Sequence, residues 1–215
     1  MDIVKLHYPV DDSIIFNDKV VLAMGFFDGL HKGHQRVIEV ARQKAAKLGV
    51  KLAVLTYDHH PALVYKKLTP HQQRYLTLTD YKMKLFQKYG VDHVFLVNYS
   101  WKFQSQTPSE FAGGFLKRLN AVAVVAGFDH TYGKKDQATM AVLPKYSHGA
   151  FEVITVPKVE LNGQKISSTN IRTELDAGNV AQVDQQLGRP FQTKGVIVHG
   201  EERGRLLGYP TANVQ

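Results

Sequence analysis

Two histidines, His31 and His34, stand where a glycine-bearing turn leads into the start of an expected helix. The turn spans residues 24–34 and follows the apolar run 20–23, while residues 35–48 carry apolar side chains at helical spacing. Glycines let the backbone come close to a ligand, and the free N–H groups at a helix start favour negative charge. Histidines three residues apart share one face of a helix. The stretch therefore predicts a site for a phosphate or polyphosphate.

A second stretch with similar chemistry lies at residues 166–172. Ser167, Ser168 and Thr169 supply hydroxyls of the kind that cap helices, and Arg172 follows one turn into the expected helix. Hydroxyls, free N–H groups and a guanidinium at one helix start make an anion clamp. Taken alone, the stretch is equally consistent with a plain helix cap beside a surface arginine. Two such stretches in one chain favour a ligand with several phosphates.

Short apolar runs alternate with amphipathic segments, and this alternation predicts a Rossmann-like α/β domain whose parallel sheet is covered on both faces. We expect strands at about 20–23, 52–57, 93–98 and 121–126, and helices at about 35–48, 79–89, 108–119 and 179–187. Ligands of such sheets bind beyond the carboxyl ends of the strands. Polar motifs follow three of these strands directly, at residues 24–34, 58–61 and 127–133. They should therefore converge on one rim of the sheet.

The composition describes a soluble globular protein of one or two domains, with 215 residues, 44% of them hydrophobic and 21% charged. No apolar run approaches the ~18 residues that span a bilayer, and the first residues do not form a signal peptide. The chain has no cysteine, which excludes disulfides, thiolate nucleophiles and cysteine-ligated zinc. These features fit a cytoplasmic location.

The formal net charge of +8 has two interpretations. Basic residues gather between residues 32 and 51, and basic helices attract the phosphate backbone of nucleic acids. The simpler interpretation is a solvated helix face beside a site for small anionic molecules. Because no helix-turn-helix, zinc-finger or RNP-type motif accompanies the charge, we do not predict binding of nucleic acid.

The run Gly25-x-Phe27-Asp28-Gly29-x-His31-x-Gly33-His34 resembles the nucleotidyltransferase signature, in the longer form of the bacterial bifunctional riboflavin kinase/FMN adenylyltransferase (FAD synthetase) family. Residues 166–172 resemble the Ile-Ser-Ser-Thr-x-Ile-Arg motif of the same enzymes. The resemblance implies that AMP passes from ATP to FMN, giving FAD and pyrophosphate, with Mg²⁺ accompanying ATP. It implies a catalytic set of His31, His34 and Arg172, and an ATP-binding set of Gly25, Phe26, Phe27, Asp28, Gly29, His31, His34, Ser167, Ser168, Thr169 and Arg172.

The resemblance also implies where the flavin binds. Residues 56–61 resemble the family's Thr-Phe-Asp-Pro-His-Pro but depart from it at Tyr57 and His59, and residues 127–133 resemble Gly-x-Asp-Phe-x-Phe-Gly with His130 and Tyr132 replacing the phenylalanines. By that match the flavin-binding residues are His60, Pro61, Tyr65, Asp129, Thr131 and Tyr132. Packing of Tyr132 or His130 in the core is the alternative. A zinc site of His31, His34, His59 and His60 is a further alternative, although its spacing fits no common structural site.

The last residues resemble the opening of a riboflavin kinase domain, whose Pro-Thr-Ala-Asn motif places Thr211 and Asn213 on Mg²⁺ and ATP. We expect a strand at 195–200. Residues 188–215 are far shorter than the ~50–200 residues of a typical domain, and a β-barrel does not close with one or two strands. The expected domains are therefore residues 1–187, the adenylyltransferase, and 188–215, an incomplete β-barrel kinase domain without kinase activity.

Two other functions stay open at this point. One is another adenylyltransferase of the same superfamily, acting on nicotinate mononucleotide or phosphopantetheine. The other is a flavin- or nucleotide-binding module without catalysis, which the pair His31 and His34 disfavours because binding alone needs no group that stabilises a transition state. The oligomeric state is not readable from the sequence.

Overall fold

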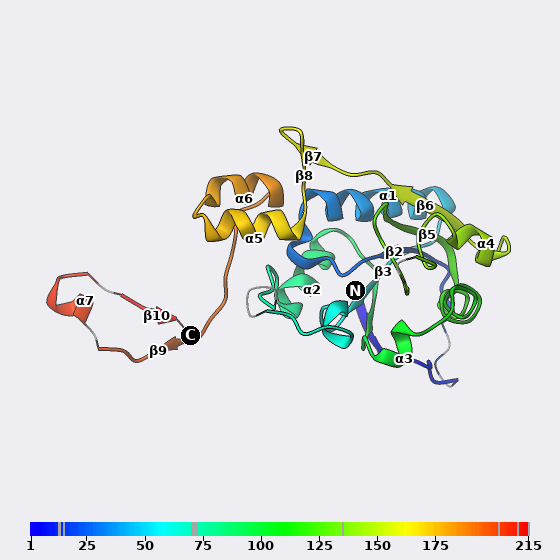
Figure 1. The fold of residues 1–215 in the computed structure, drawn as a ribbon, viewed down its shortest axis with the longest axis horizontal. Coiled ribbons are helices and arrows are strands. Elements are labelled where there is room, and N and C mark those ends of the chain that lie inside the picture. The colour runs from blue at the N-terminus through cyan, green and yellow to red at the C-terminus, as the bar shows by residue number, and fades with distance from the viewer. Residues whose placement is uncertain are drawn as a thin grey trace.

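A six-stranded sheet forms the centre of the molecule in the computed structural model (Figure 1). The structure describes every residue except 13, 15, 70–72, 135, 202, 210 and 215. All five neighbouring pairs are parallel and the strand order is β1-β4-β3-β2-β5-β6. The predicted parallel α/β sheet is therefore confirmed. The strands are β1 (Asp2–Leu6), β2 (Val20–Met24), β3 (Lys51–Tyr57), β4 (His93–Val97), β5 (Ala121–Gly127) and β6 (Glu152–Val156).

Helices cover both faces of this sheet. Alternate residues of β2 point to opposite sides, so Val21 and Ala23 join one apolar cluster while Leu22 and Met24 join another. The first cluster contains α1 (Lys32–Leu48) and α2 (Thr79–Lys88), and the second contains α3 (Trp101–Gln104), η3 (Glu110–Leu116) and α4 (Leu143–Ser147). Burial on both faces explains why the strands are continuous apolar runs.

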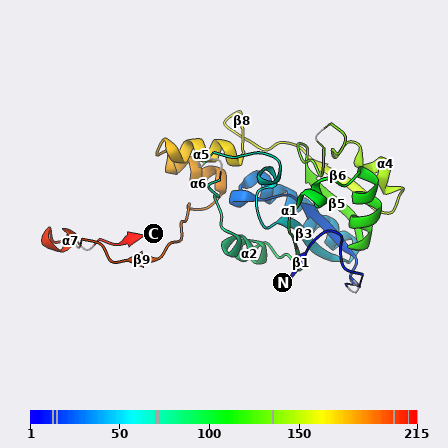
Figure 2. The same ribbon diagram turned by 60° about the horizontal axis from the view of Figure 1, so that its bottom comes forward.

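A smaller apolar cluster joins α5 (Ser168–Asp176) and α6 (Val180–Leu187) to the loop that precedes α2. Its buried members are Leu76, Ile166, Ile171, Val183 and Leu187. The two helices lie side by side beyond one end of the sheet (Figures 1 and 2). This cluster brings the second phosphate-binding motif toward the glycine turn.

The expected helix at 108–119 differs from the prediction, because residues Glu110–Leu116 form a π-helix. Gly113 and Gly114 lie within it and have no side chain to oppose the wider turn, while Phe111 and Phe115 stack with ring centroids 5.8 Å apart and stay buried. The sequence also did not predict strand β1 or the hairpin of β7 (Glu160–Leu161) and β8 (Gln164–Lys165).

The segment after α6 runs away from the sheet (Figures 1 and 2). It contains β9 (Ile197–Val198), α7 (Arg203–Leu206) and β10 (Asn213–Val214), and the two strands pair antiparallel. The expected strand at 195–200 is thus reduced to two residues, and the described residues here form no barrel. Ile197 and Tyr209 are 72% and 73% exposed. Within the described part of the chain, every helix is too short or too polar to cross a membrane.

Candidate active site

The glycine turn between β2 and α1 has an unusual backbone. Phe27, Gly29 and Leu30 all have positive φ angles, of 57°, 79° and 41°. Phe27 and Leu30 are not glycines, and such residues adopt this conformation only where the surroundings hold it in place. Both side chains are buried, at 1% and 0% exposed. The turn is therefore shaped by contacts from the rest of the fold.

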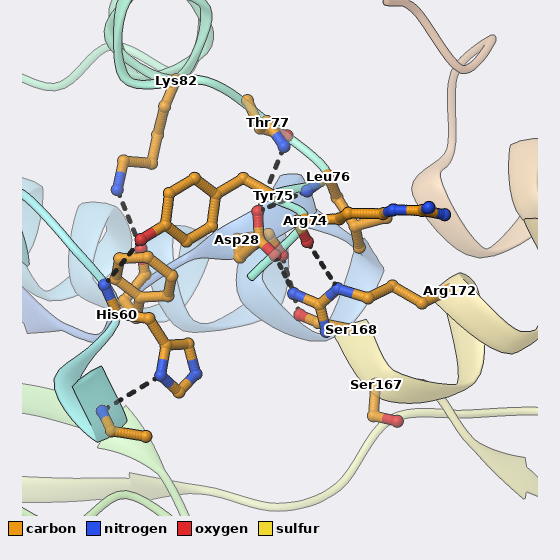
Figure 3. Close-up of polar contacts among 12 residues, drawn as sticks. Asp28, His60, Arg74, Tyr75, Leu76, Thr77, Lys82, Ser167, Ser168 and Arg172 are labelled. Atoms are coloured by element: carbon orange, nitrogen blue, oxygen red, sulfur yellow. Dashed lines mark hydrogen bonds and ion pairs between the residues drawn. The ribbon is translucent and has the colours of Figure 1, made fainter. Parts of the chain in front are cut away.

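Asp28 makes the first of these contacts, from a side chain that is only 3% exposed. Its carboxylate accepts hydrogen bonds from the backbone N–H groups of Leu76, at 2.9 Å, and Thr77, at 3.1 Å. The same carboxylate forms an ion pair with Arg172, 144 residues away in the chain (Figure 3). The Ser168 hydroxyl donates to the Asp28 carbonyl at 2.9 Å. One buried residue thus fastens the loop before α2 and the start of α5 to the glycine turn.

The guanidinium of Arg172 is held from a second direction, because its Nε donates to the Arg74 carbonyl at 2.8 Å (Figure 3). Burial raises the pKa of Asp28, and the positive charge of Arg172 acts in the opposite direction. Ser167 caps α5, since its hydroxyl accepts from the N–H of Asn170 at 3.2 Å. The expected helix start at residues 167–168 is confirmed.

The two histidines form a stacked pair at the start of α1. His31 is the N-cap residue, and its Nδ1 accepts from the backbone N–H of His34 at 3.3 Å. The rings lie 3.7 Å apart at an angle of 17°. A Cβ at Gly33 would stand 3.1 Å from the His31 ring, so the absence of a side chain leaves room for that ring. The rings of His34 and Phe27 are nearly perpendicular, with centroids 5.3 Å apart.

Burial disfavours the charged form of both histidines. Burial lowers the pKa of His31 to about 4. Burial also lowers the pKa of His34 well below its usual value, and the neighbouring His31 and Lys82 act in the same direction. Among the described residues the buried Nδ1 of His34 has no hydrogen-bond partner. A bound anion would favour the charged forms of both rings.

Lys82 is a buried cation that the sequence analysis missed. Its Nζ donates to the Phe26 carbonyl at 3.1 Å, the Thr56 hydroxyl at 3.3 Å and the Tyr57 carbonyl at 3.4 Å. It therefore joins the ends of β2 and β3. Burial lowers the pKa of Lys82 to about 8. The sequence pattern that could have predicted this burial is the position of Lys82 on α2, where residues 82, 85 and 86 share the buried face.

The candidate site is a cavity of about 650 Å³ at the carboxyl ends of β2, β3, β5 and β6. It contains residues of all three motifs that follow strands, and of the second anion clamp. His34 and Arg172 line the same cavity. Those of the predicted residues that line it are Gly25, Phe26, Phe27, Asp28, His31, His34, His60, Pro61, Tyr65, Asp129, Thr131, Ser167, Ser168, Thr169 and Arg172.

Four of the predicted residues lie elsewhere. Gly29 packs behind the turn, where a Cβ would come 2.9 Å from the Leu76 side chain. Tyr132 is 2% exposed and stacks on Phe111 at 4.7 Å, so it belongs to the core. Thr211 and Asn213 lie in the exposed segment after α6.

Several residues that line the cavity were not predicted. Tyr57 and Tyr99 are aromatic neighbours, with ring centroids 4.7 Å apart. Lys158 and Lys165 lie on the segment that contains the β7–β8 hairpin, and Lys165 pairs with Asp129 at 2.5 Å. The hairpin is formed of two-residue strands, which leave little periodicity for a sequence pattern to reveal. The cavity lining therefore includes two ion-paired lysines that the motifs did not indicate.

The described residues contain no group of three or more His, Asp or Glu side chains that would hold a metal ion. The four-histidine zinc hypothesis thus has no support in the described part of the chain. Mg²⁺ likewise has no carboxylate site of this kind there, and we assign it no protein ligands in the cavity.

A larger groove of about 920 Å³ runs beside α1 and the end of α2. Its lining includes five basic residues, Lys32, Arg36, Arg42, Lys88 and Lys158. None of the predicted phosphate or flavin residues lines it. The motifs therefore identify the smaller cavity as the candidate active site.

A six-stranded parallel α/β sheet with two helix starts at one cavity is consistent with the nucleotidyltransferase class. Residues 14–170 match the family model described as FAD synthetase, and residues 187–215 match the one described as riboflavin kinase. The chain belongs to the FAD synthetase family, as predicted.

Two curated relatives carry the name bifunctional riboflavin kinase/FMN adenylyltransferase. The protein of Listeria monocytogenes is 42% identical over the whole chain, which covers 68% of that protein. The protein of Bacillus subtilis is 39% identical over 91% of the chain and 62% of that protein. The chain thus spans about two thirds of the length of these relatives.

A solved structure of a macrolide-efflux protein from Streptococcus pneumoniae is similar to this chain, with a TM-score of 0.88 and 35% identity over 99% of this chain and 69% of its own. A pantothenate synthetase from Thermus thermophilus has a TM-score of 0.51 at 16% identity, over 85% of this chain and 72% of its own, which shows a shared fold alone.

The Asp28–Arg172 contact is testable by a double-mutant cycle. Asp28→Asn and Arg172→Met each leave a largely buried charge unpaired, so we expect each to lower the free energy of unfolding by about 3 kcal/mol. The double variant should lose less than the sum, with a coupling of roughly 1–3 kcal/mol in urea unfolding. The exposed pair Arg42–Glu39 is the control, with an expected coupling below ~1 kcal/mol. An Asp28–Arg172 coupling no larger than that control would contradict the assignment.

Stability should depend on pH through the buried histidines. Burial lowers the pKa of both His31 and His130 from 6.5 to about 4. Below pH 6.5 the unfolded chain binds protons that the folded chain excludes, so stability falls as the pH drops from 6.5 toward 4. The slope is up to ~1.4 kcal/mol per pH unit for each histidine. Urea midpoints measured across this range in the parent and in His130→Gln should show a shallower fall in the variant. Identical curves would contradict a lowered pKa for His130 in the folded chain.

Proposed function

We propose that this chain transfers AMP from ATP to FMN, giving FAD and pyrophosphate. The observation that carries the proposal is that His31, His34 and Arg172 line one cavity, since these residues come from the two anion-binding motifs. Membership of the FAD synthetase family supports FMN as the acceptor. It favours this function over the same-superfamily enzymes that act on nicotinate mononucleotide or phosphopantetheine.

The triphosphate would bind between the starts of α1 and α5. On one side the stacked rings of His31 and His34 and the N–H groups of α1 face the ligand. On the other side stand the hydroxyls of the 167–169 turn and the guanidinium of Arg172. A guanidinium has five N–H donors, so contacts with Asp28 and the Arg74 carbonyl leave donors for a phosphate.

The FMN phosphate would attack the α-phosphorus of ATP in line. One P–O bond forms to the FMN phosphate oxygen, and the bond to the leaving pyrophosphate breaks. No side chain has to act as a nucleophile, so the protein contributes positioning and stabilisation of developing negative charge. The negative charge of ATP would favour the charged form of a nearby histidine. Because the Nδ1 of His31 accepts from the N–H of His34, the Nε2–H of His31 is the donor that the ring offers to a phosphate.

The flavin would bind against the aromatic and apolar part of the cavity. We assign this role to His60, Pro61, Tyr65, Asp129 and Thr131, which line the cavity. Aromatic side chains suit the isoalloxazine ring, which is flat and largely apolar. The additional lining residues Tyr57, Tyr99 and Phe128 fit the same surface. Tyr132 would support the 127–133 loop from the core, through its stacking on Phe111.

The match to the riboflavin kinase family covers residues 187–215, and Thr211 and Asn213 would contact Mg²⁺ and ATP in a complete kinase domain. Mg²⁺ would reach the adenylylation cavity bound to the phosphates of ATP.

Pyrophosphate release from the purified chain tests the proposed function. With ATP present, FMN should give pyrophosphate and FAD, detected by the quenching of flavin fluorescence. Riboflavin, nicotinate mononucleotide and phosphopantetheine should give neither product. Release of pyrophosphate with one of the other acceptors and not with FMN would show that this acceptor is the substrate. Tight binding of FMN or ATP without any pyrophosphate would favour the non-catalytic module.

Variants of the two histidines test the assigned roles. Asn at position 31 preserves the helix cap and removes the ring, so His31→Asn and His34→Asn should fold normally. Each should lower kcat by ~10²–10³-fold, as expected for loss of one well-placed charge stabiliser. His148→Asn is the control, because His148 is exposed and has a left-handed backbone that asparagine tolerates. Parent-like kcat in the variants of His31 and His34 would remove both from the mechanism.

A further inference from the structure

Arg189 reaches back from the end of α6 to the glycine turn. Its Nη2 donates to the Gly29 carbonyl at 2.7 Å, and its Nη1 donates to the Leu30 carbonyl at 3.3 Å. The same Nη1 also donates to the Leu187 carbonyl at 3.3 Å, at the end of α6. The guanidinium carbon lies 6.0 Å from the centre of the Tyr81 ring. One side chain thus joins the end of α6 to the turn that precedes His31.

Gln35 makes a second bridge between the same two places. Its Nε2 donates to the Leu30 carbonyl at 2.8 Å and to the Leu187 carbonyl at 2.7 Å. Helix ends leave carbonyls without partners, and Leu187 occupies such a position. Because two different side chains converge on these carbonyls, the contact is a built feature of the fold.

The carbonyls that Arg189 binds belong to the strained part of the turn. Gly29 and Leu30 have positive φ angles, and the next residue is His31, the N-cap of α1. Asp28 holds the turn from one side through Arg172 and the N–H groups of Leu76 and Thr77. Arg189 holds the carbonyls of the two residues that follow Asp28. Removing Arg189 would take this partner from the Gly29 carbonyl and leave Gln35 on the Leu30 carbonyl, so the backbone before His31 would be held less firmly.

We propose that Arg189 is a positioning residue for the adenylyl transfer, fixing the Gly29 and Leu30 carbonyls and through them the His31–His34 pair. The kinetic part of this inference rests on the proposed function. Arg189 lies outside the FAD synthetase match, residues 14–170, and inside the riboflavin kinase match, residues 187–215. The expected boundary after residue 187 would also assign it to the kinase part. By its contacts, however, Arg189 serves the adenylylation turn.

Arg189→Met and Arg189→Lys test the proposal in the full chain. Arg189→Met should lower kcat by ~10²-fold, the typical effect of a small displacement of catalytic groups, while the KM for FMN stays near the parent value. Arg189→Lys keeps the charge but loses the forked geometry, so its kcat should lie between that of the parent and that of Arg189→Met. Arg42→Met is the matched control, because Arg42 pairs with Glu39 on the exposed side of α1, and its kcat should equal that of the parent.

Rescue separates positioning from general destabilisation. Free guanidinium, at concentrations too low to denature the chain, should raise the kcat of Arg189→Met and leave the parent and Arg42→Met unchanged. A variant that is merely less stable would not gain activity from guanidinium. Arg189→Met with parent-like kcat, or with a loss that guanidinium does not reverse, would overturn the proposal. If Arg189→Met does not fold, the same outcomes are applied to Arg189→Lys.

Two measurements without substrate keep this inference separate from the proposed function. In Arg189→Met the backbone amides of residues 29–31 should exchange with solvent faster than in the parent, and the imidazole NMR signals of His31 and His34 should shift. Arg42→Met should show neither change. If the parent releases no pyrophosphate, the proposed function fails. The amide exchange and the NMR signals still test whether Arg189 holds the turn in place. Unchanged exchange and signals in Arg189→Met would overturn the proposal by themselves.

Discussion

The candidate site depends on one buried carboxylate. Asp28 binds two backbone N–H groups of the loop before α2 and forms an ion pair with Arg172 of α5, while its own carbonyl accepts from Ser168. A buried charge is tolerated only when its partners are in place, so the loss of one of these contacts destabilises the others. The pair of anion-binding motifs is therefore one unit, and the residue that connects the two motifs is itself part of the glycine turn.

The cavity combines histidines whose charged form is disfavoured by burial with cations that are paired to carboxylates. Burial lowers the pKa of His31 and of His34. Three of the cations that line the cavity have a carboxylate partner: Arg172 pairs with Asp28, Lys165 with Asp129, and Lys158 with Glu160. A triphosphate in this cavity would therefore compete with these carboxylates for the same cations.

The chain contains matches to two families, and contacts of residues at the start of the second match connect them. The sheet domain carries the FAD synthetase match, while the segment after residue 195 extends away from it with exposed side chains such as Ile197 and Tyr209. Arg189 stands at the join and binds the carbonyls of the glycine turn. A boundary drawn from sequence similarity therefore separates this residue from the turn that it holds.

The sequence by itself determined the features that depend on neighbours along the chain. Periodicity located the central strands and α1, the serine at position 167 indicated a helix start, and most of the residues that the motifs identified line the cavity. Tertiary structure decided the rest. The Asp28–Arg172 pair joins residues 144 positions apart, and neither spacing nor composition specifies such a partner. The buried amine of Lys82 and the core position of Tyr132 are likewise consequences of packing. Only a folded chain brings these groups together, because each contact depends on several elements meeting in space.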